Sequence, residues 1–176
     1  DDFRPYILKS VDYGMTWNVQ GSEIEENSFV RVVREDPNRE GLLYAGTERG
    51  MYMSPDAGTS WYKWQRNLPI VPITDLVVHG NDIVLATQGR SFWILDDLTP
   101  LHEYSAEMAS KNIHMFDVED SYKVLRSAMR RQGPLGKNPY YGTEVKFFLR
   151  DYDEEDSTEL MVEFMGEGMN VLKTFS

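Results

Sequence analysis

The sequence contains no cysteine, which excludes disulfide bonds and thiolate chemistry. It has no run of about 18 apolar residues, the length that a membrane-spanning helix requires. Positive charge is scarce as well, since 18 Lys and Arg stand against 29 Asp and Glu, a formal net charge of −11. We therefore do not expect the phosphate backbone of a nucleic acid as a partner. These absences exclude classes of function without selecting one.

The most informative stretch is LLYAGTERGMYMSPDAGTSW at residues 42–61. Its apolar runs 42–47 and 50–54 predict two short strands joined by a tight turn. Asp56 and Gly58 then predict a second turn, because an Asp carboxylate accepts backbone N–H groups ahead of it and Gly tolerates a positive φ. The Trp that follows opens the next strand and buries a large ring.

This pattern recurs along the chain. The Ser, Asp, Gly and Trp of SVDYGMTW at 10–17 coincide with those of SPDAGTSW at 54–61, at an offset of 44 residues. A third copy, ATQGRSFWILDD at 86–97, aligns with 45–56 at an offset of 41 and keeps only the Asp. A strand-rich period of about 40–45 residues is typical of the blades of a β-propeller.

The repeated motif S-x-D-x-G-x-T-W resembles the Asp box, or bacterial neuraminidase repeat, of sialidases, xyloglucan-degrading hydrolases and sortilin-type receptors. The run 42–101 also resembles the end of the propeller in bacterial sortilin-like proteins that are often labelled glycosyl hydrolases. Ser60 takes the place of the motif's Thr in the second copy. The matching residues are Ser10, Asp12, Gly14, Thr16 and Trp17, and then Ser54, Asp56, Gly58, Ser60 and Trp61.

Residues 1–101 predict nine strands in groups of two, four and three. The ranges that carry the pattern are 6–10, 29–34, 42–47, 50–54, 60–64, 73–79, 82–87 and 91–95, with one more strand after Trp17. A propeller closes with about four to eight blades of four strands, so nine strands cannot close one. We therefore expect 1–101 to be the C-terminal part of an Asp-box propeller, in a chain that begins inside a repeat of a longer protein.

Beyond residue 101 the pattern changes. Residues 103–110 predict a short helix, and 112–116 a strand that leaves the propeller. The Arg-, Gly-, Pro- and Asn-rich residues 127–142 predict a linker, so 102–142 is interpreted as a connecting segment. Residues 143–176 predict further strands, with Gly166 and Gly168 in a hairpin, and read as the start of a β-sandwich. The expected fold class is all-β: a partial propeller followed by part of a sandwich.

The two Asp boxes allow two interpretations. Asp12 and Asp56 could be catalytic or bind a metal ion, or they could brace the turns in which they lie. Asx-type turn bonding accounts for an Asp at this place, which favours bracing. The resemblance also implies that the box lies away from the active site. We expect each Asp to accept backbone hydrogen bonds within its own turn, with Trp17 and Trp61 largely buried.

The face opposite the boxes is the expected ligand face. Blade strands alternate in direction, so the turns between second and third strands and the crossing 66–72 share that face. Its candidate residues are Glu48, Arg49, Gln88 and Arg90. An Arg fork suits a carboxylate or a sugar acid, although solvated or ion-paired arginines are the alternative. An exposed Trp64 or Trp93 would add a platform for a sugar, whereas packing between blades is the alternative.

Groups for catalysis or metal binding are sparse. Asp96 and Asp97 form an adjacent carboxylate pair near the repeat, but neighbouring strand residues point to opposite faces, and Asp97 occupies the position of the Asp in the incomplete third copy of the motif. The acidic run 151–156 lacks the Gly and spacing of an EF-hand and reads as a solvated turn. His79, His102 and His114 show no metal-binding spacing. We expect neither a metal ion nor a cofactor.

Two functions remain open at this point. The resemblance implies either a sortilin-like propeller that binds a peptide or a glycan, or part of a sialidase- or xyloglucanase-like glycoside hydrolase. It also implies a secreted, periplasmic or outer-surface bacterial protein. The chain itself is expected to be non-catalytic. Uncovered sheet faces near Met51, Tyr52, Phe92 and Trp93 predict either self-association or a hairpin 6–20 folded back onto the sheet at 73–95.

Overall fold

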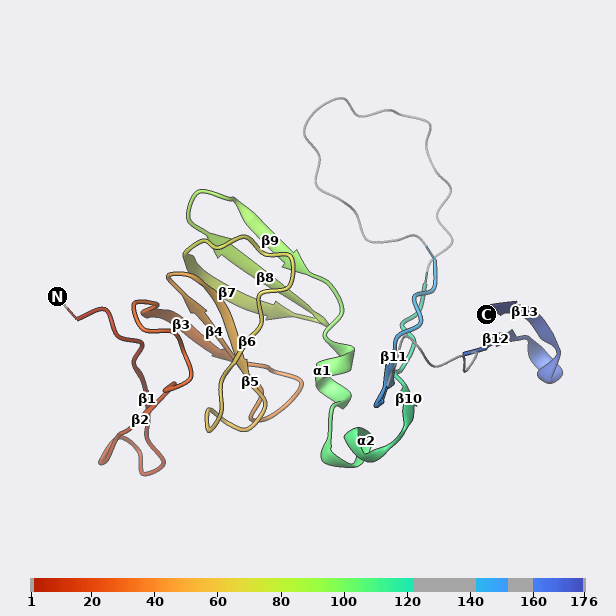
Figure 1. The fold of residues 1–176 in the computed structure, drawn as a ribbon, viewed down its shortest axis with the longest axis horizontal. Coiled ribbons are helices and arrows are strands. Elements are labelled where there is room, and N and C mark those ends of the chain that lie inside the picture. The colour runs from red at the N-terminus through yellow and green to blue at the C-terminus, as the bar shows by residue number, and fades with distance from the viewer. Residues whose placement is uncertain (1, 122–141, 152–159, 176) are drawn as a thin grey trace.

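The computed structural model describes residues 2–121, 142–151 and 160–175 of the 176-residue chain. These residues form an all-β fold of several antiparallel sheets with a few short helices between them (Figure 1). Most of the predicted linker 127–142 and of the acidic run 151–156 lies outside the described residues. No helix in the described ranges is long and apolar enough to cross a membrane.

All nine strands predicted before residue 101 are confirmed, in sheets of two, four and three strands. The first sheet pairs β1 with β2, the second has the order β3-β4-β5-β6, and the third has the order β7-β8-β9. The bounds are β1 Ile7–Lys9, β2 Asn18–Gln20, β3 Val30–Glu35, β4 Leu43–Thr47, β5 Gly50–Ser54, β6 Tyr62–Lys63, β7 Ile73–His79, β8 Asp82–Thr87 and β9 Phe92–Leu95.

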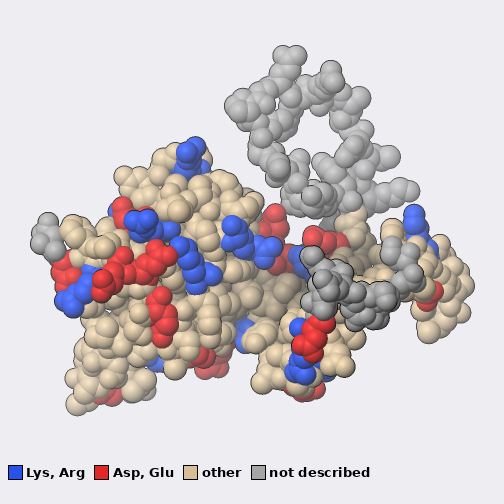
Figure 2. All heavy atoms as spheres, in the orientation of Figure 1, with Lys and Arg blue, Asp and Glu red and all other residues tan. Residues whose placement is uncertain are grey.

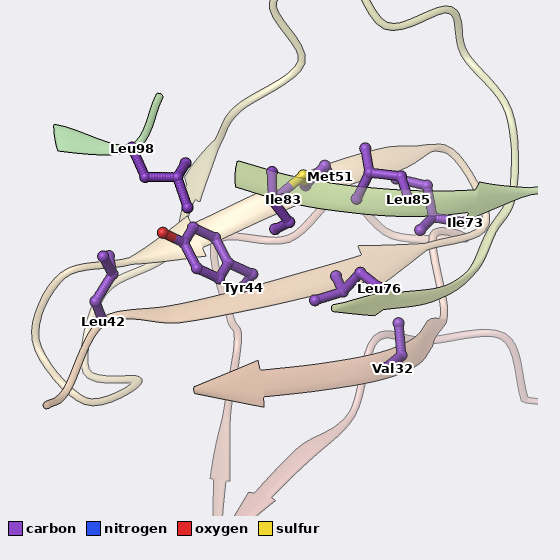
Figure 3. Close-up of a cluster of buried hydrophobic side chains, with 9 residues drawn as sticks. All are labelled: Val32, Leu42, Tyr44, Met51, Ile73, Leu76, Ile83, Leu85 and Leu98. Atoms are coloured by element: carbon purple, nitrogen blue, oxygen red, sulfur yellow. The ribbon is translucent and has the colours of Figure 1, made fainter. Parts of the chain in front are cut away.

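The main core lies between the second and third sheets, which pack face to face (Figure 3). Tyr44 and Met51 of the second sheet meet Ile73 and Ile83 of the third, and all four are buried. Close packing requires a glycine on β4, because a Cβ at Gly46 would lie 2.7 Å from Cγ2 of Ile73. Burial of side chains of this size contributes about 1.5–3 kcal/mol each, so this interface is the main source of the fold's stability.

A second, smaller core covers the opposite face of the second sheet. Ala45, Tyr52 and Trp61 pack there against Ile24, and Ile7 of β1 packs beside them. The β1–β2 hairpin therefore lies on the side of the second sheet away from β7–β9. The fold-back of residues 6–20 onto the third sheet is not what the structure has, because the second sheet occupies the face that the hairpin would need.

The uncovered apolar surface differs from the expected one. Met51 and Tyr52 are buried, so the prediction that they expose apolar surface is wrong: each faces one of the two cores. Phe92 is 76% exposed, as expected, whereas Trp93 is half-buried against the main core. Outward-facing Val77 and Ile94 are exposed beside Phe92. The open apolar face thus lies on the outer side of the third sheet.

The helix predicted at 103–110 is two shorter helices, α1 (Thr99–Glu103) and α2 (Ala106–Ser110). Ser105 ends the continuity because it is extended and its side chain accepts a hydrogen bond from Met108 N, as an N-cap does. Pro100 lies in the first turn of α1, where its missing N–H costs nothing. The helix predicted at 103–110 is therefore confirmed over 106–110 and wrong at its start, because Ser105 separates α2 from α1.

The later strands form two small sheets. β10 (Ile113–Met115) pairs with β11 (Phe147–Leu149), so one sheet joins the segments predicted as 102–142 and 143–176. β12 (Val162–Met165) and β13 (Val171–Phe175) form a hairpin, as predicted, around the short 3-10 turn η1 (Glu167–Met169). Among the described residues these two sheets are separate, each with two strands.

We predict that Gly46→Ala lowers the free energy of unfolding by about 1–3 kcal/mol, because the new methyl group overpacks the interface between the sheets. Ala86 is the matched control. It takes the same place in the third sheet, paired with Phe92 as Gly46 is with Met51, but on the open face. Ala86→Val should change stability by less than about 0.5 kcal/mol. Urea unfolding of both variants measures the difference, and equal losses would contradict the packing described here.

Candidate functional site

The second Asp box forms a closed hydrogen-bonded turn between β5 and β6. Ser60 N donates to Asp56 Oδ1 at 2.8 Å, and Ser54 Oγ donates to the same oxygen at 2.8 Å. Gly58 N donates to Ser54 Oγ at 2.9 Å, and Trp61 Nε1 donates to the Gly58 carbonyl at 3.1 Å. Each motif residue thus serves the turn, which explains the S-x-D-x-G-x-x-W spacing without any ligand.

The first Asp box repeats this turn almost bond for bond. Thr16 N and Ser10 Oγ each donate to Asp12 Oδ1 at 2.8 Å, and Gly14 N donates to Ser10 Oγ at 2.7 Å. Trp17 Nε1 donates to the Gly14 carbonyl at 3.1 Å. The Thr adds one bond, Oγ1 to Asp12 Oδ2 at 2.6 Å. The expectation that both carboxylates accept backbone hydrogen bonds within their own turns is confirmed.

The backbone of the two boxes matches as closely. Tyr13 and Ala57, which follow the two Asp residues, both have φ of 57°, and the glycines after them have φ of 88° and 87°. A positive φ is unfavourable for a residue with a Cβ, so the turn bonds must stabilise it. The hydrogen bonds from the Thr16 side chain and backbone and from Ser10 lower the pKa of Asp12 to about 2. Its carboxylate is therefore ionised and committed to the turn.

The environments of the two boxes differ. Trp61 is buried in the smaller core, but Trp17 is 59% exposed, so the prediction of a buried Trp17 was wrong. The ring still lies over Gly14, but no described sheet packs on the outer side of the β1–β2 hairpin. Lys9 Nζ joins the two turns by donating to the Ala57 carbonyl at 2.6 Å.

The incomplete third copy of the motif, at 86–97, has an Asp with a structural role, Asp97. Leu98 N donates to the Asn81 carbonyl at 2.7 Å, just as Ala57 N donates to the Gly41 carbonyl at 2.7 Å. Asp97 accepts from Thr99 N at 3.0 Å and pairs with Lys146. Burial alone would raise the pKa of Asp97, but the hydrogen bonds from Lys146 and Thr99 outweigh it and hold the pKa below its usual range.

Asp96, beside it, behaves differently. Burial, with a smaller effect from the neighbouring Asp82 carboxylate, raises the pKa of Asp96 above its usual value. Opposite shifts in two carboxyl groups can mark an acid and a base. Here the shift of Asp97 arises from bonds that hold the start of α1 and fix Lys146, so the pair does not present two free carboxylates to a ligand.

A buried polar cluster lies at the same end of the sheets as the Asp boxes. Asp36 is 3% exposed, and its Oδ2 accepts from Tyr44 Oη at 2.8 Å and lies 2.9 Å from His102 Nε2. Asp36 Oδ1 accepts from Asn38 N at 2.8 Å. Burial and then the Asp36 carboxylate raise the pKa of Tyr44. The sequence interpretation missed this cluster, because Asp36 and His102 are 66 residues apart and only the fold brings them together.

The opposite rim carries the four candidate ligand residues in two separate turns. Glu48 accepts from Arg31 Nε at 2.8 Å, and Arg49 Nε lies 3.9 Å from Glu25 Oε2. Glu48 is therefore ion-paired with a residue of β3, and Arg49 with a residue of the connection between β2 and β3. Acidic and basic side chains are interspersed over the face shown in Figure 2, without a large patch of one sign.

Gln88 and Arg90 lie in the equivalent turn of the third sheet, and both are exposed. Among the described residues Arg90 has no ion pair. The two turns are built alike: Thr47 Oγ1 donates to the Gly50 carbonyl at 2.8 Å and Thr87 Oγ1 to the Ser91 carbonyl at 2.6 Å. Glu48 N and Gln88 N donate to the Phe29 and Pro72 carbonyls.

The two tryptophans singled out as sugar platforms flank a narrow, mostly apolar hollow between the second and third sheets. Its walls include Met51, Trp64, Leu68, Trp93 and Leu95. Both rings are half-buried, and Trp64 stacks on Tyr44 with centroids 5.9 Å apart and an interplanar angle of 22°. Packing between the sheets therefore accounts for most of each ring, and the remaining part faces the hollow.

His79 is the last residue of β7, and its side chain is exposed. His114 lies on β10, with Nε2 3.1 Å from Glu103 Oε2. Within the described ranges, no group of three or more His, Asp or Glu side chains is arranged to hold a metal ion.

The two boxes make a matched pair for a stability test. Asp56→Ala should lower the free energy of unfolding by about 1–3 kcal/mol, because two hydrogen bonds to a carboxylate disappear beside a buried core. Asp12→Ala removes an equivalent turn beside an exposed Trp, so its effect on global unfolding should be clearly smaller. Thermal melting of both variants measures this. Equal melting temperatures for the two variants would contradict the structural role assigned to the second box.

Comparison of the chain with models of protein families, with curated proteins and with solved structures gives no match. The candidate site is therefore defined by geometry. One rim holds the braced Asp turns and the buried Asp36 cluster. The other rim holds exposed Gln88 and Arg90 above the hollow between Trp64 and Trp93.

Proposed function

We propose that the chain is part of a sortilin-like Asp-box β-propeller that binds a peptide or a glycan and is not catalytic by itself. The observation that carries this proposal is the pair of Asp-box turns, which share four bonds and matching φ angles on consecutive sheets. Sheets of two, four and three strands then represent the last blades. The strands after residue 142 are assigned to the start of a β-sandwich, and the parent protein to the outside of a bacterial cell.

The proposed ligand face is the rim opposite the Asp boxes. Its turns are held by repeated backbone contacts, so Gln88 and Arg90 project from a fixed frame. Arg90 can present its planar fork to a carboxylate of a peptide or a sugar acid. Arg49 is 3.9 Å from Glu25, a distance loose enough for a ligand carboxylate to compete for the guanidinium. The partly covered rings of Trp64 and Trp93 supply apolar contact below this rim.

The carboxylates do not favour hydrolysis. A glycosidase needs two carboxyl groups on either side of one bond, about 5–9.5 Å apart. Glu48 is paired with Arg31, Glu25 with Lys63, and Asp97 with Lys146. The Asp-box carboxylates accept turn hydrogen bonds. Among the described residues, no free pair faces the hollow, which supports binding over the glycoside hydrolase alternative.

To test this proposal, the whole chain is screened against a phage library of random dodecapeptides and a printed glycan array. Ligands recovered in either screen should bind the double variant Arg49→Gln, Arg90→Gln at least about tenfold more weakly, because two charge-assisted contacts are lost. Arg34→Gln is the matched control, since Arg34 lies near the end of β3 that is opposite this rim and its side chain is paired with Asp75. Equal weakening by the control, or no ligand in either screen, would count against the proposal.

The same preparations are assayed with aryl glycosides. No turnover is expected from residues 1–176. Hydrolysis that Asp97→Asn abolishes would instead favour the glycoside hydrolase.

A further inference from the structure

Asp97 lies where the chain leaves the third sheet, and its backbone has a left-handed conformation with φ of 60°. Such a conformation is unfavourable for a residue with a Cβ and persists only where neighbouring bonds stabilise it. Asp97 N donates to Asp82 Oδ1 at 3.0 Å, and Asp97 Oδ1 accepts from Thr99 N at 3.0 Å. The second carboxylate oxygen contacts Lys146 Nζ. One residue is thus bonded to β8, to α1 and to the residue that precedes β11.

Lys146 places a positive charge among four neighbouring carboxylates. Its Nζ contacts Asp97 and lies 3.9 Å from Glu144 Oε2. Burial raises the pKa of Asp96, the Asp82 carboxylate raises it further, and Lys146 opposes both effects. The side chains of Lys146 and Asp97 are 27% and 18% exposed, so solvent screens this pair less than it screens ion pairs on the open surface. The ammonium group therefore neutralises carboxylates that would otherwise repel one another.

The main chain of Lys146 belongs to a different element from the carboxylates that surround its side chain. Phe116 N donates to the Lys146 carbonyl at 3.0 Å, and Arg150 N donates to the Asn112 carbonyl at 3.0 Å, so both bonds extend the β10–β11 ladder. The Lys146 side chain reaches from this ladder to the end of the third sheet. It therefore joins two elements that the backbone hydrogen bonds do not join.

The other contacts of the β10–β11 ladder with the helices are also polar. Glu103 of α1 accepts from Asp117 N at 2.8 Å, and its second oxygen lies 3.1 Å from His114 Nε2. Arg150 Nη2 donates to the carbonyl of Ala109 in α2. As far as the chain is described, neither of the two cores contains a residue of β10 or β11. A junction of this kind can open while the cores stay folded.

We infer that the contact between Lys146 and Asp97 is an electrostatic latch, which fixes the β10–β11 ladder to the end of the third sheet and releases it when the contact is screened or lost. Without the ammonium group, Asp96 and Asp97 face Glu144 with like charge, which drives the two sides apart. Salt has the same direction of effect, because it screens the attraction. This inference rests on contacts within the chain and does not depend on the proposed propeller.

Pulsed electron paramagnetic resonance on the whole chain tests the latch. The sequence has no cysteine, so Val77→Cys on β7 and Met115→Cys on β10 give two unique sites for spin labels, and both side chains are exposed. At low salt the distribution of distances between the labels should be narrow. Lys146→Gln should broaden it at least about twofold. Salt at about 1 M, where the Debye length is about 3 Å, should broaden it as well.

Lys63→Gln is the matched control, because the Lys63 side chain pairs with Glu25 and joins β6 to the connection between β2 and β3. It should leave the distribution narrow. Asp97→Asn removes the charge but keeps an oxygen for Thr99 N, and Asn tolerates a positive φ. It should broaden the distribution as Lys146→Gln does. The double variant should be no broader than either single variant, as expected for two partners in one contact.

Thermal melting separates opening of the junction from loss of the fold. Lys146→Gln should change the melting temperature by less than about 2 °C, because the two cores do not include the latch. A narrow distribution in Lys146→Gln, equal broadening by Lys63→Gln, or additive broadening in the double variant would overturn the inference. A large fall in melting temperature together with the broadening would also overturn it, since the contact would then belong to the cooperative fold.

Discussion

The structure depends on the face-to-face packing of the second and third sheets. Tyr44 and Met51 on one side and Ile73 and Ile83 on the other form the one large buried core of the described residues. Its geometry sets the other features. Gly46 must lack a side chain so that the sheets can approach, and Leu98 must close the end of the core before the chain turns into α1. Both rims of the molecule are positioned by this interface.

The turns at the two rims are held in different ways, and we propose that one rim braces the fold while the other binds a ligand. At one end, the Asp turns, the buried Asp36 cluster and the start of α1 hold the strand ends together through hydrogen bonds that leave no described buried polar side chain without a partner. At the other end, backbone hydrogen bonds and the hydroxyl groups of Thr47 and Thr87 hold the turns, and Gln88 and Arg90 are exposed on them. A surface of this kind supports a binding function, because its polar groups are exposed while the frame beneath them is fixed.

The sequence could predict what short-range chemistry decides. Alternation and turn residues located the nine strands, and the S-x-D-x-G motif predicted that Asp12 and Asp56 accept backbone hydrogen bonds within their own turns, because each donor lies within a few residues. The sequence could not predict features that depend on contacts between residues far apart in the chain. Trp17 and Trp61 share one motif and one local bond, yet only Trp61 has a core to enter. Asp36 and His102 gave no signal, since nothing in their local sequence requires them to meet.

The central claim is that the third sheet repeats the second, and that among the described residues no strand pairs with the outer edge of β9. Hydrogen-bonded pairs between β8 and β9 fall at Trp93 and Leu95, so the N–H groups of Phe92 and Ile94 point away from β8. Native-state hydrogen exchange of the chain alone, followed residue by residue, tests this claim most directly. On β9, the amides of Trp93 and Leu95 should exchange slowly and those of Phe92 and Ile94 quickly, whereas the amides of Met51 and Met53 on β5 should both be slow. Slow exchange at Phe92 and Ile94 would mean that the edge is already filled and would contradict the account.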